Sequence, residues 1–422
     1  MRAWFWGLAA AAFVPIIVFG ANGTVILLAL IALAAPGFAA WRRALMVMAA
    51  QPVGWALGGL LILAAVSLVW TPSPLMSLVN LSRLFILWFG GCAALAAARE
   101  APDDVLKWLV RLLPAGVCLA LILYWIEIAT SVRLISLFTG LQAVVQARFP
   151  LPEEQEYYRI VYGFGAISRG AVLLSIFVWP AMGCLMILFP VRGKWLAAAL
   201  GTAVIVTIYL LPMRAAPLAM AVGAGAFAWA WVSPQRGPRL MALLTIVLIG
   251  VTPLIAYQVT RPETVGIEKR ALPGSWQHRV EIWHYAAQKI AEKPLLGWGF
   301  DASRTLGGTT QFVLEQPDGA KITFPGVSLL PLHPHNGILQ VWLEMGAAGA
   351  LLLMGMMYGI GQRLAANERE HGRLGGAMAS AVTASALSVG LLSFGLWQSW
   401  WQASLWLGAV LCLATLRRLN PR

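Results

Sequence analysis

Residues 337–361, GILQVWLEMGAAGALLLMGMMYGIG, decide the fold: this run of 25 residues holds one charged side chain, Glu344. About 20 consecutive apolar residues are enough for a helix to cross the hydrocarbon core of a bilayer. The whole chain of 422 residues has the same character, because 60% of it is hydrophobic and only 11% is charged. Soluble proteins carry about a quarter charged residues. The composition therefore predicts an integral membrane protein.

Twelve apolar runs of about this length follow one another along the chain. They are continuous rather than alternating, which favours membrane helices over a β-barrel. Their approximate bounds are 3–21, 24–41, 54–71, 84–99, 108–129, 170–190, 195–212, 215–233, 240–258, 337–361, 375–395 and 399–416. The sequence therefore predicts an all-α, polytopic membrane protein with about 12 transmembrane helices.

Basic residues, which give the chain a net charge of +13, gather in alternate connections between these runs. On one side of the membrane lie Arg42, Arg43, Arg99, Lys107, Arg192, Lys194, Arg236, Arg239, Arg363, Arg369 and Arg373, and the tail adds Arg417, Arg418 and Arg422. Cytoplasmic loops are enriched in Lys and Arg, so this pattern predicts that both termini are cytoplasmic. A cleaved signal peptide over 3–21 is an alternative, although no typical cleavage site follows it. No nucleic-acid-binding motif is apparent, and membrane lipids are the expected surroundings.

Two connections on the opposite side are long, about 130–169 and 259–335. Long connections are where a membrane protein can keep a water-facing site. We therefore divide the chain into residues 1–258 with nine helices, a large, partly helical outer loop over 259–335 that carries the site, and residues 336–422 with three helices and a cytoplasmic tail.

The segment His333-Pro334-His335-Asn336-Gly337 lies where the large loop enters the tenth apolar run. Asn336 is a favourable helix N-cap, and the positive end of the helix that it begins would favour an anionic group. A histidine there has an ordinary pKa near physiological pH and can act as a general base. Helix capping alone and a His-x-His metal site are the alternatives, but further metal ligands at suitable spacing are not evident.

Two arginines are candidate ligands for such an anion. Arg214 lies in a short outer turn, residues 211–217, where a charge so close to hydrocarbon needs a partner. The planar guanidinium suits phosphate, whereas snorkelling to lipid headgroups is the alternative. Arg279 lies in a predicted loop helix that runs to about Lys293 and stops at Pro294. It could reach the same pocket as Arg214 and His335, or it could be a solvated arginine on an amphipathic helix.

Several other residues are candidates for supporting roles near this site. They are His278 in the loop helix, Arg159 and Arg169 in the first long connection, and His333 and Asn336 beside His335. The group Trp397, Trp400, Trp401 and Trp406 is typical of an aromatic belt at the membrane interface.

Together these residues resemble the shared core of the O-antigen ligase and O-antigen polymerase superfamily, and most of all the O-antigen ligases of lipopolysaccharide biosynthesis. The resemblance covers about residues 200–360. It rests on Arg279 with Trp283 a turn later, the segment 294–299 (PLLGWG), His335 with Asn336, and Glu344 with Gly346 and Gly349.

The resemblance implies a fold of the GT-C glycosyltransferase type and a site at the periplasmic face of the bacterial inner membrane. The implied donor is a glycan on undecaprenyl diphosphate, and the implied acceptor is a sugar hydroxyl of lipid A-core. Arg214 and Arg279 would bind the diphosphate, His335 would be the catalytic base, and transfer would invert the anomeric centre. No metal or other cofactor is implied, and the chain contains no Asp-x-Asp motif. His333 before His335 and Met213 before Arg214 depart from the usual family pattern.

Three other functions stay open at this point. An O-antigen polymerase would differ only in its acceptor, a second lipid-linked repeat unit. A protein O-oligosaccharyltransferase would use a serine or threonine hydroxyl as acceptor. A polytopic transporter would show broken helices in two matching halves, whereas the charges here gather in outer loops around one histidine.

Overall fold

The computed structural model describes residues 2–261 and 271–419, and most of them are helical. The helices are α1 (Arg2–Phe19), η1 (Ala21–Gly23), α2 (Thr24–Leu33), α3 (Phe38–Ala49), α4 (Pro52–Ser67), α5 (Pro74–Arg99), α6 (Asp103–Ala129), α7 (Arg133–Phe138), α8 (Leu141–Arg148), α9 (Pro152–Leu188), α10 (Gly193–Leu210), α11 (Ala215–Val232), α12 (Arg236–Val259), α14 (Gly274–Glu292), α15 (Ser303–Leu306), α16 (Gly337–Leu392) and α17 (Ser399–Leu419). One antiparallel hairpin joins β1 (Thr309–Glu315) to β2 (Lys321–Ser328).

Seven helices within the described residues are long and apolar enough to cross a membrane: α5, α6, α9, α11, α12, α16 and α17. The α2–α3 pair, bent by 113°, passes the same test when it is taken as one span. Helices α1, α4 and α10 are apolar but shorter, and α16 contains two of the predicted runs. The predicted multi-pass helical fold is thus confirmed, whereas twelve spans and a GT-C-type arrangement stay predictions.

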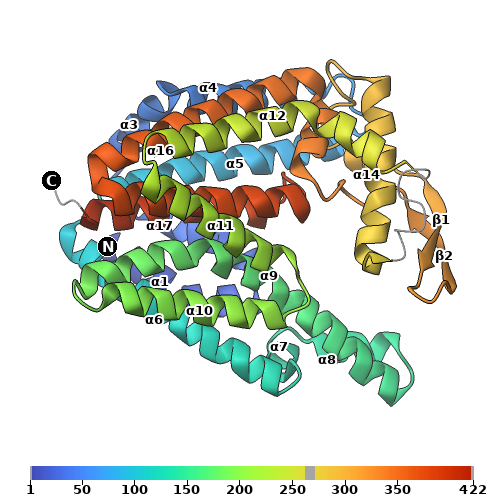
Figure 1. The fold of residues 1–422 in the computed structure, drawn as a ribbon, viewed down its shortest axis with the longest axis horizontal. Coiled ribbons are helices and arrows are strands. Elements are labelled where there is room, and N and C mark those ends of the chain that lie inside the picture. The colour runs from blue at the N-terminus through green and yellow to red at the C-terminus, as the bar shows by residue number, and fades with distance from the viewer. Residues whose placement is uncertain (1, 262–270, 420–422) are drawn as a thin grey trace.

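The first long connection differs from the expected loop, because residues 133–138, 141–148 and 152–169 are helical. Helix α9 starts outside the apolar run at Pro152, a favoured first-turn residue, with Glu153 and Glu154 suiting the positive helix start. It continues without interruption into the bundle. Figure 1 shows this part of α9 and α8 projecting from the same end of the bundle as α14.

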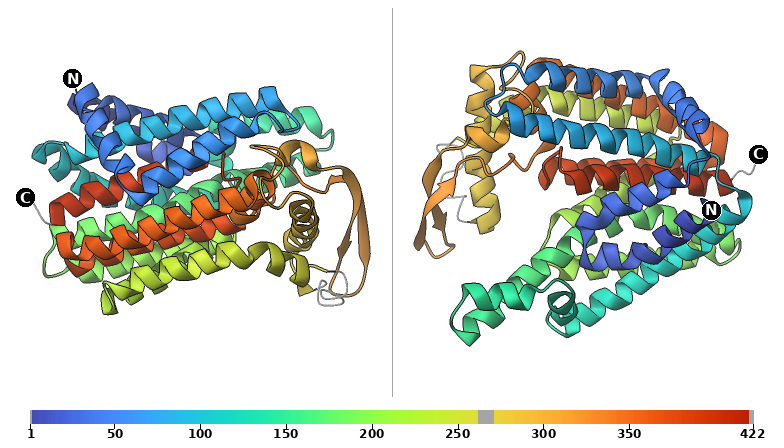
Figure 2. Two further views of the ribbon diagram at one scale, coloured as in Figure 1. Left: turned by 90° about the horizontal axis from the view of Figure 1, so that it is seen from above. Right: turned by 180° about the vertical axis from the view of Figure 1, so that it is seen from behind.

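The bundle has two distinct ends. Helix α14 and the hairpin lie at one end, and both chain termini lie at the other (Figures 1 and 2). Basic residues of the predicted cytoplasmic set make contacts near the termini: the Arg43 guanidinium pairs with Glu100 at 2.7 Å, and Arg417 donates to the carbonyl oxygens of Ala98 and Ala101. Both termini therefore lie on the same side of the bundle, opposite the large loop.

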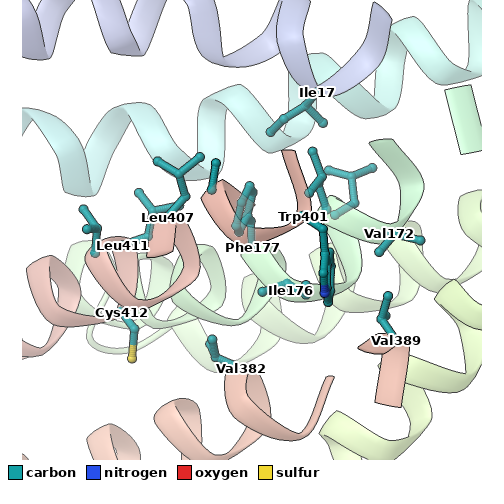
Figure 3. Close-up of a cluster of buried hydrophobic side chains, with 14 of the residues drawn as sticks. Ile17, Val172, Ile176, Phe177, Val382, Val389, Trp401, Leu407, Leu411 and Cys412 are labelled. Atoms are coloured by element: carbon teal, nitrogen blue, oxygen red, sulfur yellow. The ribbon is translucent and has the colours of Figure 1, made fainter. Parts of the chain in front are cut away.

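The core packs α9 against α1, α16 and α17. Figure 3 shows Phe177 of α9 among Ile17, Val382 and Leu407, with Trp401 nearby. Trp397 and Trp400 are also buried. The prediction of an interfacial belt is therefore wrong for these three tryptophans, because their indoles face the protein interior rather than headgroups.

Helix α16 is broken at Gly346, where the backbone has φ 60° and ψ −157°. In a continuous helix the amides of Ala347 and Ala348 would donate to the carbonyls of residues 343 and 344. Here they donate to the carbonyls of Pro294 and Leu295, at 2.8 and 3.1 Å. The large loop therefore replaces the missing turn of the helix.

Residues 294–299 of the large loop also supply donors for the two carbonyls of α16 that lose their partners at the break, those of Leu343 and Glu344. The amide of Trp298 donates to Leu343 O at 2.9 Å, and the amide of Gly299 donates to Glu344 O at 2.8 Å. Two glycines allow the approach, since a Cβ on Gly297 or Gly346 would lie 2.4 Å from a backbone carbon of the other segment. We call residues 294–299 the docked segment. It fixes the large loop to a membrane-spanning helix.

Candidate active site

A cavity of about 470 Å³ opens at the end of the bundle that carries α14. Its walls come from α9, the turn before α11, the start of α14, residues 333–335 and the connection between α16 and α17. Five of the eight predicted site residues line it: Arg169, Arg214, Arg279, His333 and His335. Segments more than 220 residues apart in the chain thus meet in one pocket, and Arg214, Arg279 and His335 lie together in it, as the sequence predicts.

The His335 imidazole is held in one orientation. Its Nδ1 lies 2.8 Å from the carbonyl oxygen of Ser393, an acceptor, so Nδ1 carries the proton and donates it. In the neutral ring Nε2 is then unprotonated. Burial lowers the pKa of His335, with a smaller lowering from the Arg279 charge, while the Ser393 bond acts in the opposite direction. The side chain is therefore a neutral base at pH 7.

His333 has a different role. Its Nδ1 accepts a hydrogen bond from the backbone amide of His335 at 3.1 Å, and the two rings lie edge to face, 4.3 Å apart. The side chain is 6% exposed, and burial lowers its pKa to about 3. His333 is thus a neutral acceptor that supports the backbone of His335, which itself has φ 53°.

Asn336 caps α16 as the sequence predicts. Its Oδ1 accepts from the amides of Ile338 and Leu339, at 3.0 and 3.1 Å. The cap satisfies two of the amides that lack a partner at the start of a helix. It fixes the start of α16 directly beside His335.

Three arginines face the cavity. Arg214 stands at the start of α11 and donates from Nη1 to the carbonyl of Tyr209 at 3.0 Å. Arg279 stacks over Trp276, 5.3 Å from the ring centre, and burial lowers the pKa of its guanidinium. Within residues 2–261 and 271–419 none of the three pairs with a carboxylate, and no acidic side chain lines the cavity. The pocket therefore carries fixed positive charge and can hold an anion with several negative charges.

Three predicted supporting residues do not line the cavity: Asn336, which caps α16, and His278 and Arg159. His278 packs against Phe312, and its Nε2 lies 3.4 Å from the carbonyl of Ser328. Arg159 is buried and pairs with Glu156 at 2.6 Å. Their positions indicate structural contacts with the hairpin and within α9, respectively.

The connection between α16 and α17 is the part of the site that sequence reasoning missed. Ser393 reaches His335 through its backbone carbonyl, so its residue type gives no signal. Gln398 lies 3.4 Å from His333 Nε2. A metal site at His333 and His335 lacks further ligands, because no group of three or more His, Cys, Asp or Glu side chains gathers anywhere in the described chain.

Comparison with known proteins agrees with this picture. The family described as "O-Antigen ligase" matches residues 196–354, which include Arg214, Arg279, His335 and the docked segment. A protein of Rickettsia conorii is 27% identical over 333 residues, which is 78% of this chain and 71% of the relative. One of Rickettsia prowazekii is 28% identical over 341 residues, 80% of this chain and 74% of the relative. Both are named "Putative polysaccharide ligase". The resemblance to the O-antigen ligase family that the sequence predicts is thereby confirmed.

Proposed function

We propose that this protein is an O-antigen ligase. It transfers O-antigen polysaccharide from undecaprenyl diphosphate to a sugar hydroxyl of lipid A-core. The observation that carries the proposal is the cavity itself: three arginines without carboxylate partners among the described residues stand beside a neutral, oriented histidine. That combination is suited to a reaction in which a hydroxyl loses a proton and a diphosphate leaves.

In the proposed complex Arg214 and Arg279 bind the diphosphate of the donor. Guanidinium groups form paired, charge-assisted hydrogen bonds with phosphate oxygens, and they strengthen as water is excluded. Arg169 adds a third positive charge to the same cavity. Binding of the diphosphate would compensate the buried charge of Arg279, whose lowered pKa reflects its desolvation.

The transfer itself is a single displacement. His335 Nε2 takes the proton from the acceptor hydroxyl while that oxygen forms a bond to the anomeric carbon. The bond between the anomeric carbon and the diphosphate oxygen breaks, and its electron pair leaves with undecaprenyl diphosphate. Arg214 and Arg279 stabilise this developing negative charge. Attack from the face opposite the leaving group inverts the anomeric centre, and the reaction uses no metal ion or other cofactor.

Three neighbouring residues position His335. Ser393 holds the tautomer of His335, His333 holds its backbone, and Asn336 fixes the start of α16. We assign no part in transfer to His278 or Arg159.

The proposed location is the bacterial inner membrane. The end of the bundle with the termini and the basic contacts would face the cytoplasm. The cavity would then face the periplasm, with residues 1–258 and 336–422 forming the helical part and residues 259–335 the outer loop. In that orientation the site lies at the level of the outer leaflet, where both lipid substrates would be present.

The test compares lipopolysaccharide from a deletion strain with undecaprenyl-linked glycan from the same cells. Bare lipid A-core together with accumulated long lipid-linked polymer is the expected result, because chain growth would be intact and only attachment lost. Core capped by a single repeat unit would show instead that the chain is a polymerase. Complementation with the wild-type chain should restore the ladder, and complementation with His335→Ala should not.

A further inference from the structure

Glu344 is a carboxylate buried inside α16, with no exposed surface. Four donors converge on its two oxygens. Oε1 accepts from the Ser303 hydroxyl and from Gln340 Nε2, and Oε2 accepts from the Asp301 amide at 2.9 Å and from Trp397 Nε1 at 2.6 Å. An ionised carboxylate is purely an acceptor, so it suits a position where every neighbour donates. Glu344 thus ties α16 to the large loop and to the connection that precedes α17.

That connection, residues 393–398, is the one that orients the candidate base. Two hydrogen bonds hold the middle of this connection to α16. Trp397 Nε1 donates to Glu344, and the Leu396 amide donates to Gln340 Oε1 at 2.7 Å. Its first residue, Ser393, supplies the carbonyl that binds His335 Nδ1. Two hydrogen bonds, with the backbone of residues 393–397 between them, therefore link Glu344 to the tautomer of His335.

We propose that Glu344 is a positioning residue for His335, an inference that rests on the proposed function. By holding residues 393–398, it keeps the Ser393 carbonyl in place, so that His335 keeps its proton on Nδ1 and presents an unprotonated Nε2 to the acceptor. When the connection shifts, the two neutral tautomers exchange. The form with a proton on Nε2 cannot accept another proton there.

The sharpest perturbation is Trp397→Phe. It removes the indole N–H that binds Glu344 and leaves an aromatic ring beside Phe300, whose ring centre lies 5.3 Å away. The matched control is Trp342→Phe, also an α16 contact, which removes an N–H that donates to Ile249 O at 2.8 Å. Glu344→Gln is the stronger variant, because it places an amide among four donors.

The experiment measures transfer by purified protein in detergent, with an undecaprenyl-diphosphate glycan donor and a lipid A-core acceptor. Complete loss of a general base costs about 10²–10⁴-fold in rate, so partial loss of its orientation should cost about tenfold in kcat for Trp397→Phe. We expect more for Glu344→Gln, an unchanged KM for the donor, and no change for Trp342→Phe. The bond to Ser393 favours the protonated ring of His335, so its loss should lower the pKa of His335. The acid limb of the rate profile should therefore move to lower pH.

Nitrogen NMR of ¹⁵N-histidine-labelled protein provides a readout that does not depend on transfer. The chain has five histidines, so the His335 signals are those missing from His335→Ala. We expect the Nδ1–H form in wild type and mixed tautomers in Trp397→Phe and Glu344→Gln. An unchanged tautomer together with unchanged kcat per folded molecule in Trp397→Phe would overturn the positioning role. Transfer that survives in His335→Ala would instead refute the proposed base, whatever the tautomer spectra show.

Discussion

Gly346→Ala tests whether the docked segment holds the site together. The backbone at Gly346, with φ 60° and ψ −157°, lies in a region that is nearly restricted to glycine. Keeping that conformation with a Cβ costs about 1–3 kcal/mol. The added Cβ would also lie 2.4 Å from the carbonyl carbon of Leu295, so the docked segment would have to move.

The chain has one other way to respond, which is to straighten α16. That would restore two helix hydrogen bonds, from Ala347 and Ala348, but it would break the four bonds to the docked segment. The net loss is two hydrogen bonds, or about 2 kcal/mol at about 1 kcal/mol each. Both responses therefore destabilise the folded state by about 2–3 kcal/mol. Transfer should fall as well, because the same loop carries Arg279 and His335.

The assay heats the detergent-solubilised protein and measures the temperature at which half of it still elutes as a monodisperse peak in gel filtration. At about 2 °C for each kcal/mol in a large chain, Gly346→Ala should lower it by about 5 °C. Two variants of α16 are matched controls: Gly372→Ala has the same backbone strain, with φ 72°, but nothing within 4 Å, and Gly355→Ala has neither strain nor a close neighbour. Equal losses for Gly346→Ala and Gly372→Ala would refute a contribution from the docked segment.

Three further predictions concern the cavity. His335→Ala should abolish transfer while membrane insertion stays normal; product at wild-type level from this variant would remove His335 from the mechanism. Arg214→Ala and Arg279→Ala should each lower kcat/KM for the donor by about 10²–10³-fold, as loss of one charge-stabilising donor does, whereas Arg148→Ala on exposed α8 should not. Burial depresses the pKa of His333 to about 3 in the folded state, against an ordinary 6.5, so proton uptake favours the unfolded chain and stability should fall by up to about 1.4 kcal/mol per unit as pH drops below 6.5. In His333→Gln that slope should flatten, and a slope that persists would show that other groups cause it.

The sequence predicted five of the residues that line the cavity, but not the contacts that hold them in place. Arg214, Arg279 and His335 could be predicted to meet because the alternating basic connections put all three on one side of the membrane. Arg169 and Arg159 looked equivalent in the sequence, yet α9 turns one toward the cavity and the other toward Glu156. The exact rotation of a helix depends on its packing partners, which one sequence does not specify.

The helical character of the chain was predicted better than the bounds of its elements. Residues 152–169 are rich in charge and were expected to be a loop, but charged residues do not interrupt a helix that extends into water. Conversely, 337–361 was expected to be one uninterrupted helix, although Gly346 breaks it. The break depends on a partner, the docked segment, 50 residues earlier in the chain. Hydrophobicity alone contains no information about that contact.

The arginine that would bind the leaving group also affects the base. Burial is the main cause of the lowered pKa of His335, and the charge of Arg279 lowers it further. A bound diphosphate would compensate that charge, so the pKa of His335 should rise in the complex and the base should become stronger when the acceptor arrives. The acid limb of kcat, which reports the complex, should therefore lie at higher pH than the acid limb of kcat/KM, which reports the free protein. In Arg279→Gln both limbs should move to higher pH, because the protonated His335 ring no longer faces that cation. Coincident limbs in the wild-type protein would contradict this coupling between the diphosphate site and His335.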